Sequence, residues 1–312
     1  MDGFINILKP PGMSSHDVVK FLRKYFPGTK IGHGGTLDPG AAGVLPVMLG
    51  KATRLSSCLM GFPKIYRAEL CLGITTDTAD SHGRIVSRRP LLHFNMDNLE
   101  GVLHSFTGEI RQVPPMFSAI KKDGKKLYEY ARKGITIERK ARRVKIFFIK
   151  VIDYFPQQKI LLEIKCSMGT YIRTLCADIG ETLGCGGHMS FLLRKEVGKF
   201  KLGDAQTLNK LQLLAKENRL SSVILPLDYI FERSKGVTLD NYNLKLLYQG
   251  RPVALEAIKK DFGPDLSSLP VDGNIFPIYT TGSEFVALAS WEKDKMSNYF
   301  LKPKKIFNTT VV

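Results

Sequence analysis

The part of the sequence most suggestive of chemistry is the stretch 32–50, which is crowded with glycine and contains two prolines. Glycine-rich loops can cradle phosphate groups with their backbone amides, so nucleotide binding is the first chemistry to test. A P-loop ending in the Gly-Lys pair at 50–51 would need glycine in place of Leu45 and a hydroxyl side chain in place of Ala52. A dinucleotide fingerprint would need its third glycine in place of Leu37. Both nucleotide-binding motifs therefore fail.

The same stretch contains one carboxylate, Asp38, in a rigid setting. Gly34 and Gly35 allow positive φ angles or the close approach of a ligand, and Pro39 fixes the backbone directly after the carboxylate. A loop with this much backbone strain is typical of a functional site. The alternative is that Asp38 caps the Asp-Pro-Gly turn that begins with it, which is a common arrangement. The residue types alone favour this turn over a catalytic role.

Other catalytic and metal-binding patterns are missing from the sequence. A serine nucleophile would be marked by the elbow GxSxG, which is absent. The five cysteines form no CxxC pair, so we interpret them as reduced thiols of a cytoplasmic protein. The six histidines are scattered without a Cys/His cluster, which argues against a zinc site.

The charge of the chain is more unusual than its size or hydrophobicity. The 312 residues contain 46 Lys and Arg against 29 Asp and Glu, a formal net charge of +17. Such a charge favours a polyanionic partner, either nucleic acid or an anionic membrane surface. The sequence has no apolar run of the ~18 residues that a membrane span needs and no signal peptide at its start. Nucleic acid is therefore the expected partner, with no membrane association.

The elements that must position Asp38 follow from hydrophobic periodicity and capping residues. We expect the stretch 32–50 to be a long shaped loop that ends in a buried segment at 44–49, with a short helix at 51–60. The predicted strands are 4–8, 64–73, 84–87, 108–113, 144–154, 159–167 and 189–198. One predicted helix begins near Ser14 or Ser15. The other predicted helices are 96–106, 171–183, 207–216 and 240–248. Strands and helices interleave at hairpin-length links, which predicts an α+β fold with a mixed, mainly antiparallel sheet.

The stretch 114–143 differs from the rest because basic residues dominate it and alternate with Phe117, Tyr128 and Tyr130. We interpret it as an excursion from the core with a short helix near 125–133. Charge runs usually form a solvated face, but in a chain of +17 they also suit contact with RNA phosphates. The candidate RNA-binding residues are Lys121, Lys122, Lys125, Lys126, Arg132, Lys133 and Arg142.

Six ordered sequence blocks resemble those of TruB-type tRNA pseudouridine synthases. The first blocks are KPPGMSS at 9–15 and GHGGTLDP, AGVLP and LGKAT within 32–53; the remaining ones are KIYRA at 64–68, GITTDTADSHG at 73–83, QVPPMFSA from 112 onward through Arg142, and GTYIRTL at 169–175. The resemblance covers 1–230 and implies a catalytic domain with an RNA-gripping insertion at about 113–143. The sequence GRPV at 250–253 resembles, more weakly, a PUA-type RNA-binding domain, here 231–312.

The resemblance implies that the chain isomerises uridine to pseudouridine in the T loop of tRNA, at position 55. This reaction breaks an N–C glycosidic bond and remakes it to carbon without redox change, so no cofactor and no metal are expected. It needs a nucleophile that can also leave, a role that the resemblance assigns to Asp38. Arg173 matches the arginine of the family's active site and is expected to lower the pKa of Asp38. Asp80 would in turn hold Arg173.

The remaining residues implied by the resemblance would bind the flipped uridine. Tyr66 would stack on the uracil, and its hydroxyl would move the C5 proton. Tyr171 and Leu192 would complete the pocket, and His33 would occupy or stack against the space left by a neighbouring base. Lys9 would either contact an RNA phosphate or order the loop.

Two other functions fit the same residues. One is a non-catalytic RNA-binding or RNA-folding protein, against which the intact Asp38 argues. The other is a pseudouridine synthase for rRNA or another RNA. We expect a cytoplasmic monomer that binds the T stem-loop of tRNA, and the sequence implies no protein partner.

Overall fold

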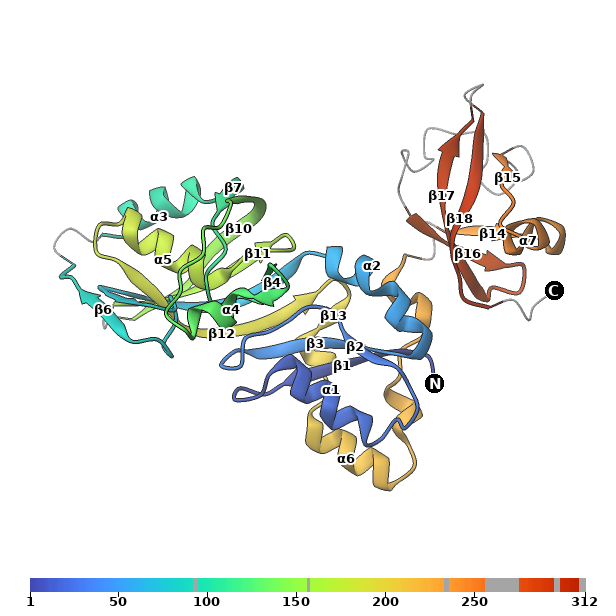
Figure 1. Ribbon diagram of the computed structural model, residues 1–312, viewed down its shortest axis with the longest axis horizontal. Coiled ribbons are helices and arrows are strands. Elements are labelled where there is room, and N and C mark those ends of the chain that lie inside the picture. The colour runs from blue at the N-terminus through green and yellow to red at the C-terminus, as the bar shows by residue number, and fades with distance from the viewer. Residues whose placement is uncertain (92–94, 156–157, 233–235, 256–274, 295–297, 309–312) are drawn as a thin grey trace. The chain divides into compact units, whose positions relative to one another are not determined.

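The computed structural model describes residues 1–91, 95–155, 158–232, 236–255, 275–294 and 298–308 (Figure 1). Contacts divide the chain into two compact units. The larger unit comprises Ile5–Met48 and Ser56–Val223, and the smaller comprises Met1–Phe4, Leu49–Leu55 and Ile224–Val312. The segment 226–236, where the sequence pattern changes, includes 233–235, which lie outside the described residues. Across the described ranges, no helix is both long and apolar enough to cross a membrane.

A nine-stranded sheet forms the centre of the larger unit, with the order β1-β3-β12-β4-β11-β10-β7 and with β2 and β13 paired to β3 and β12. The pairings of β4, β7, β10, β11 and β12 with one another are antiparallel, and β12 pairs with β3 in parallel. This confirms the predicted mixed, mainly antiparallel sheet. The strands are β1 Gly3–Lys9, β2 Ile31–His33, β3 Ala42–Leu49, β4 Lys64–Leu72, β7 Gly108–Gln112, β10 Arg142–Phe155, β11 Lys159–Cys166, β12 Gly187–Val197 and β13 Phe200–Lys201.

One face of this sheet packs against two helices, α3 (Met96–Ser105) and α5 (Ile172–Thr182), which lie close together in Figure 1. The alternation in β4 explains the packing, because Ala68, Leu70 and Leu72 are fully buried in the core with both helices. The predicted strands and helices are confirmed to within a few residues. Outside the insertion, the other described helices of this unit are α1 Ser15–Arg23, α2 Ser56–Gly61, α6 Leu208–Lys216 and the 3-10 turns Leu202–Asp204 and Leu220–Val223.

The expectations for 32–50 and 51–60 need correction. Much of 32–50 is regular, because His33 ends β2 and β3 begins at Ala42, so the irregular loop is only 34–41. The segment expected to be one short helix begins with the 3-10 turn Gly50–Leu55 and continues as α2. The buried end of the stretch is confirmed, because Val44, Leu45, Val47 and Leu49 are fully buried.

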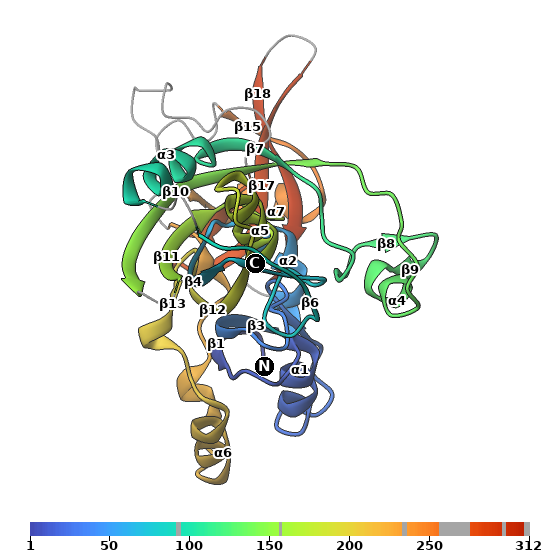
Figure 2. The same ribbon diagram turned by 90° about the vertical axis from the view of Figure 1, so that its left-hand side faces the viewer.

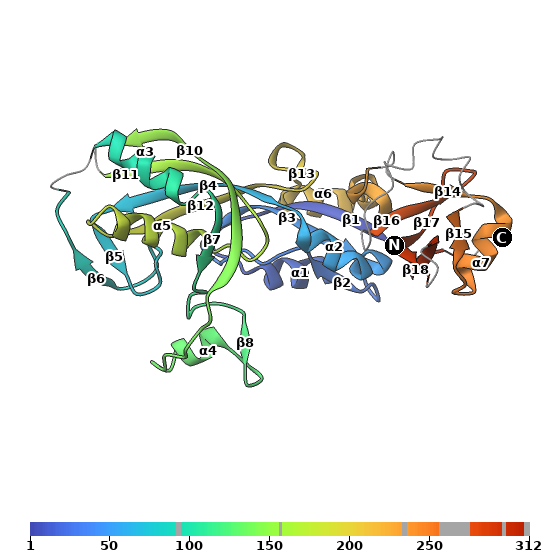
Figure 3. The same ribbon diagram turned by 90° about the horizontal axis from the view of Figure 1, so that it is seen from above.

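The insertion projects away from the sheet in two perpendicular views (Figures 2 and 3). It carries a minimal hairpin of β8 (Lys121–Lys122) and β9 (Lys125–Lys126), followed by the short helix α4 (Leu127–Ala131). A second hairpin, β5 (Ile74–Thr76) and β6 (Ile85–Arg88), holds the turn that contains Asp80.

In its described residues, the smaller unit contains a five-stranded sheet of order β14-β16-β17-β18-β15 and the α-helix α7. Its core centres on Trp291, which packs against Phe276 with ring centroids 5.7 Å apart. The predicted helix and β-rich character are confirmed. The elements are β14 Val237–Leu239, α7 Asn241–Tyr248, β15 Val253–Ala254, β16 Ile275–Thr280, β17 Phe285–Lys293, β18 Tyr299–Ile306 and the 3-10 turn Leu227–Ile230.

Candidate active site

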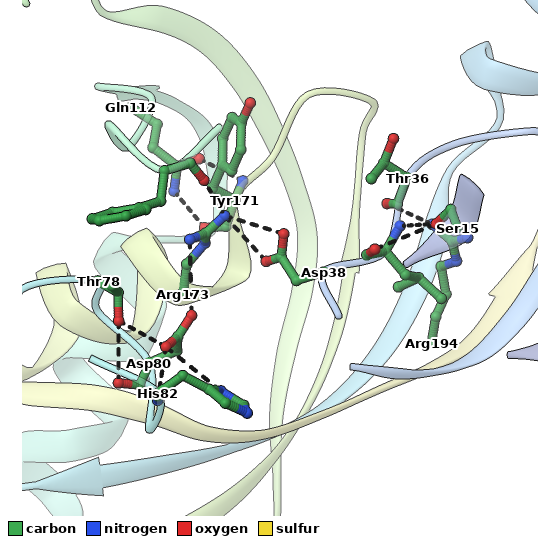
Figure 4. A network of polar contacts seen from close by, with 12 residues as sticks. Ser15, Thr36, Asp38, Thr78, Asp80, His82, Gln112, Tyr171, Arg173 and Arg194 are labelled. Atoms are coloured by element: carbon green, nitrogen blue, oxygen red, sulfur yellow. Dashed lines mark hydrogen bonds and ion pairs between the residues drawn. The ribbon is translucent and has the colours of Figure 1, made fainter. Parts of the chain in front are cut away.

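Asp38 and Arg173 meet in the larger unit although 135 residues separate them in sequence. The Nη2 atom of Arg173 lies 3.2 Å from Oδ1 and 3.1 Å from Oδ2 of Asp38. Nη1 lies 3.8 Å from Oδ2 of Asp80, so the guanidinium stands between two carboxylates (Figure 4). Arg173 is only 5% exposed, whereas the side chain of Asp38 is 40% exposed. The arrangement fixes a buried cation behind a carboxylate that a substrate can still reach.

Asp80 is itself held in place by its own turn. Its Oδ1 accepts hydrogen bonds from the hydroxyl of Thr78 at 2.7 Å and from the backbone N–H of His82 at 3.0 Å. The imidazole of His82 lies against the Asp38 loop, since a Cβ atom at Gly40 would come within 2.2 Å of its ring. The turn between β5 and β6 therefore packs onto the loop while it supports Arg173.

The pKa of Asp38 shifts in the opposite direction to the one expected. Loss of surrounding water raises the pKa of this carboxyl, even though part of the side chain is accessible. Arg173 lowers the pKa but does not outweigh this effect, and the negative charge of Asp80 adds to the rise. The sequence indicated the neighbouring cation but not the depth of the loop. Asp38 is thus less hydrated, and more basic, than an ordinary surface aspartate.

The backbone of the Asp38 loop is bound by residues of β1 and α1. The hydroxyl of Ser15 accepts from the N–H of Leu37 at 2.9 Å and donates to its carbonyl at 3.3 Å. The carbonyl of Pro39 accepts from the N–H of Gly12 at 2.8 Å and from Nζ of Lys9 at 3.2 Å. Lys9 is fully buried, and burial lowers its pKa to about 8. Of its two expected roles, this geometry fits the ordering of the loop.

Arg194 binds the same loop from β12, and sequence reasoning missed it. It is 1% exposed, and its guanidinium donates to the carbonyls of Gly35 at 3.0 Å, Thr36 at 3.4 Å and Val44 at 2.7 Å. Its residue type gave no signal, because arginine is seldom fully buried, although alternation in β12 places it on the face of the buried Leu192.

Tyr66 lies in the core next to these groups. It is 9% exposed and pairs across the sheet with Arg194 on β12 and with Ile164 on β11. Burial raises the pKa of its hydroxyl, and the charge of Arg194 opposes that shift. Leu192 is 8% exposed and belongs to the same core cluster. Two of the residues expected around the base, Tyr66 and Leu192, thus lie on strands of the central sheet, and the charge of Asp38 acts on the Tyr66 hydroxyl.

Tyr171 and Gln112 join the helix α5 to the stem of the insertion. The amide of Gln112 accepts from the N–H of Tyr171 at 2.8 Å and donates to its carbonyl at 3.0 Å. Tyr171 is the N-cap residue of α5, so this pair sets the start of the helix that carries Arg173. No role was predicted for Gln112; the one sequence signal was its place at the start of the block QVPPMFSA.

The insertion also reaches the site directly. Nη2 of Arg173 donates to the carbonyl of Phe117 at 2.7 Å, so one guanidinium contacts the insertion and Asp38. Tyr128 is flanked by Nζ of Lys126 at 5.4 Å and Cζ of Arg132 at 5.3 Å from its ring centroid. The other candidate RNA-binding residues, Lys121, Lys122, Lys125, Lys133 and Arg142, are exposed.

His33 lies at the end of β2, on the approach to the loop. Its Nδ1 is buried and has no hydrogen-bond partner within the described residues. Burial lowers the pKa of the imidazole, and the positive charge of Arg194 lowers it further. A buried ring nitrogen without a partner is an unused donor or acceptor, which is uncommon in folded proteins.

Comparisons with known proteins identify the family of the chain. A sequence model of the TruB family pseudouridylate synthase N-terminal domain matches residues 23–172, and one of the tRNA pseudouridylate synthase B C-terminal domain matches 173–232. The chain is similar to the tRNA pseudouridine synthase B of Alkaliphilus oremlandii, at 51% identity over 80% of this chain and 83% of the relative. It is similar to that of Caldanaerobacter subterraneus subsp. tengcongensis at 40% identity, over 98% and 99%.

Two solved structures resemble the fold. One is a Cbf5-Nop10-Gar1 complex, with a TM-score of 0.74 and 30% identity over 98% of this chain and 85% of the matched chain. The other is an H/ACA RNP bound to a substrate RNA containing 2′-deoxyuridine, with a TM-score of 0.73 and 27% identity over 99% and 86%.

Proposed function

The chain belongs to the TruB family of pseudouridylate synthases, and we propose that it isomerises the T-loop uridine at position 55 of tRNA with Asp38 as the nucleophile. Family membership makes it an isomerase that forms pseudouridine in tRNA. The observation that carries the finer proposal is the accessible Asp38 carboxylate backed by the buried Arg173.

The reaction breaks the bond between C1′ and N1, turns the uracil, joins C1′ to C5 and removes the C5 proton. Asp38 has a role in each of three routes. Its carboxylate attacks C1′, attacks C6, or takes the C2′ proton as the uracil leaves, which gives a glycal-type intermediate. All three require an ionised carboxylate, and Arg173 supplies the charge that favours ionisation in a poorly hydrated loop. Because Asp80 holds the other side of Arg173, the guanidinium stays aimed at Asp38.

The uridine must leave the RNA stack before Asp38 can reach it. Extrusion costs a few kcal/mol, and stacking on an aromatic ring returns about 1–3 kcal/mol per base. Tyr66 offers the ring and a hydroxyl for transfer of the C5 proton. Its pKa is raised, so the hydroxyl is protonated at neutral pH and acts as a relay. Leu192, Tyr171 and His33 would line the remaining space around the base.

The basic insertion would grip the T stem-loop, and the smaller unit would add a PUA-like RNA contact. The segment projects from the sheet (Figure 2). The candidate phosphate ligands are Lys121, Lys122, Lys125, Lys126, Arg132 and Lys133 on this segment, and Arg142 at the start of β10. We take 1–230 as the catalytic domain and 231–312 as the RNA-binding domain of a cytoplasmic monomer.

The test is tritium release from unmodified tRNA carrying [5-³H]uridine, with the product position mapped by carbodiimide modification and primer extension. Wild-type protein should release tritium and place pseudouridine at T-loop position 55. Asp38→Asn should bind the same tRNA with nearly wild-type affinity and release none, because the shape is kept and the nucleophile is lost. Binding without release by folded wild-type protein would favour a non-catalytic RNA-binding function. Product formed only in rRNA transcripts would favour the other alternative.

A further inference from the structure

We propose that Arg194 is a positioning residue for catalysis, which clamps both sides of the loop that carries Asp38. The inference rests on the proposed role of Asp38 and adds to it a residue on the opposite side of the loop from Arg173. Figure 4 shows Arg194 beside Thr36, apart from the Asp38–Arg173 pair.

The three carbonyls bound by Arg194 flank Asp38 in sequence. Gly35 and Thr36 precede the carboxylate, and Val44 follows it on β3. A single rigid guanidinium therefore ties the two ends of the loop together. The backbone of Arg194 is equally close, because a Cβ atom at Gly43 would lie 2.2 Å from its carbonyl oxygen. These hydrogen bonds leave the backbone around Asp38 little freedom to move.

The position of Arg194 within the sheet is also unusual. It pairs with Gly43 of β3 on one side and with Tyr66 of β4 on the other. The register shifts between Arg194 and Glu196, so Lys195 is the extra residue of a bulge directly after the arginine. Arg194 thus both contacts the loop and lies beside Tyr66, the tyrosine proposed to stack on the base.

The charge of Arg194 is compensated by dipoles. Within the described structure it donates to three carbonyl oxygens, the Tyr66 hydroxyl is a further hydrogen-bond partner, and no carboxylate pairs with it. A buried cation with this environment is costly, and an aliphatic side chain would fill a core position without that cost. The charge acts on neighbouring groups, because it lowers the pKa values of His33 and Tyr66. Arg194 therefore contributes two properties to the loop: a planar fork of N–H donors and a fixed positive charge.

Three variants separate these properties from simple core packing. Arg194→Met removes fork and charge, Arg194→Lys keeps the charge without the fork, and Arg219→Met is a matched control at an exposed arginine whose side chain is 66% exposed. The measurements are melting temperature, affinity for unmodified tRNA, the single-turnover rate at saturating enzyme, and the titration of His33 by NMR.

We expect Arg194→Met to lower the single-turnover rate by about 100-fold, because small misplacements of a reacting group have effects of that size. Its tRNA affinity should stay within about threefold, since the insertion is untouched. The pKa of His33 should rise, because the positive charge beside it is gone, while burial and His16 still act on it. Arg194→Lys should leave the His33 titration near that of wild type and still lower the rate by about tenfold.

A wild-type rate in folded Arg194→Lys or Arg194→Met would overturn the inference. If Arg194→Met does not fold, Arg194→Lys carries the test, because a lysine fits the same space and keeps the charge. Equal losses of rate and affinity would also overturn it, since they would indicate general damage to the fold. Failure of the proposed function is distinguishable, because wild-type protein would then be inactive while the His33 titration still reports on Arg194.

Discussion

Replacing Lys122 and Lys125 with alanine should weaken tRNA binding and flatten its dependence on salt. The two lysines face each other across the β8–β9 hairpin, and both are exposed. Neither pairs with a carboxylate in the described part of the chain. Like charges placed directly opposite each other repel, so a bound phosphate would reduce the repulsion between the two lysines. Lys126 is less suitable for the test, because it is partly buried against Tyr128.

The expected size follows from the release of counterions from RNA. Each phosphate contact contributes ~0.7 to the salt slope on a single strand and ~0.9 on a duplex, so two contacts contribute about 1.4–1.8. Between 50 and 200 mM salt, wild-type protein should therefore lose about 7- to 12-fold more affinity than the double variant. Thermal stability should hardly change, because exposed substitutions contribute within about 0.5 kcal/mol.

The assay is fluorescence anisotropy with unmodified tRNA across a salt series. A matched control is Lys210→Ala with Lys216→Ala, two exposed lysines on α6 outside the insertion. If plots of log affinity against log salt concentration coincide for wild type and the insertion variant, the reasoning is refuted, and these lysines are only a solvated face. An equal flattening by the α6 control would show that the effect is one of total charge and not of the insertion.

Three further predictions concern the site and its helix. Tyr66→Phe should keep tRNA affinity and lose product formation in single-turnover assays, because it keeps the ring and loses the relay; near-normal turnover would reduce Tyr66 to stacking. Arg173→Met should move the acid limb of the pH–rate profile to higher pH, because Asp38 must be ionised and the largest influence lowering its pKa is gone; an unmoved limb contradicts the pairing. Burial raises the pKa of Asp178 to about 6, so ionising it destabilises the fold progressively as pH rises from about 4 through 6. Asp178→Asn should therefore raise the melting temperature at pH 7.5 more than at pH 4, and equal shifts would speak against this.

Local signals in the sequence were sufficient for most elements of the fold. Ser14 and Asp17 form a capping box at the start of α1, and Gly184 adopts φ 80° just beyond the end of α5. Local rules failed for β3, because it contains Pro46 and lies between β1 and β12 in the sheet. The expectation of a loop followed from the many glycines and two prolines of this stretch; proline is normally confined to edge strands, and this strand is an exception.

The site was less accessible to such reasoning. Asp38 and Arg173 come close only in the folded chain. The resemblance to a family, and not periodicity, predicted that both belong to one site. Alternation in β12 places Arg194 on the buried face with Leu192, but its residue type argued against that position, because arginine is seldom fully buried. The upward shift in the pKa of Asp38 depends on how much water the folded loop excludes, which spacing along the chain does not encode.

The five consecutive carbonyls from Gly35 to Pro39 all accept hydrogen bonds from within the protein, and this bears on conformational entropy. Fixing one backbone residue in a single conformation costs about 1–2 kcal/mol, so ordering these five residues of the loop costs roughly 5–10 kcal/mol. Folding meets that cost once, when the loop is built. A tRNA arriving at the site does not have to order the segment that carries Asp38, and its binding free energy is left for extruding the uridine.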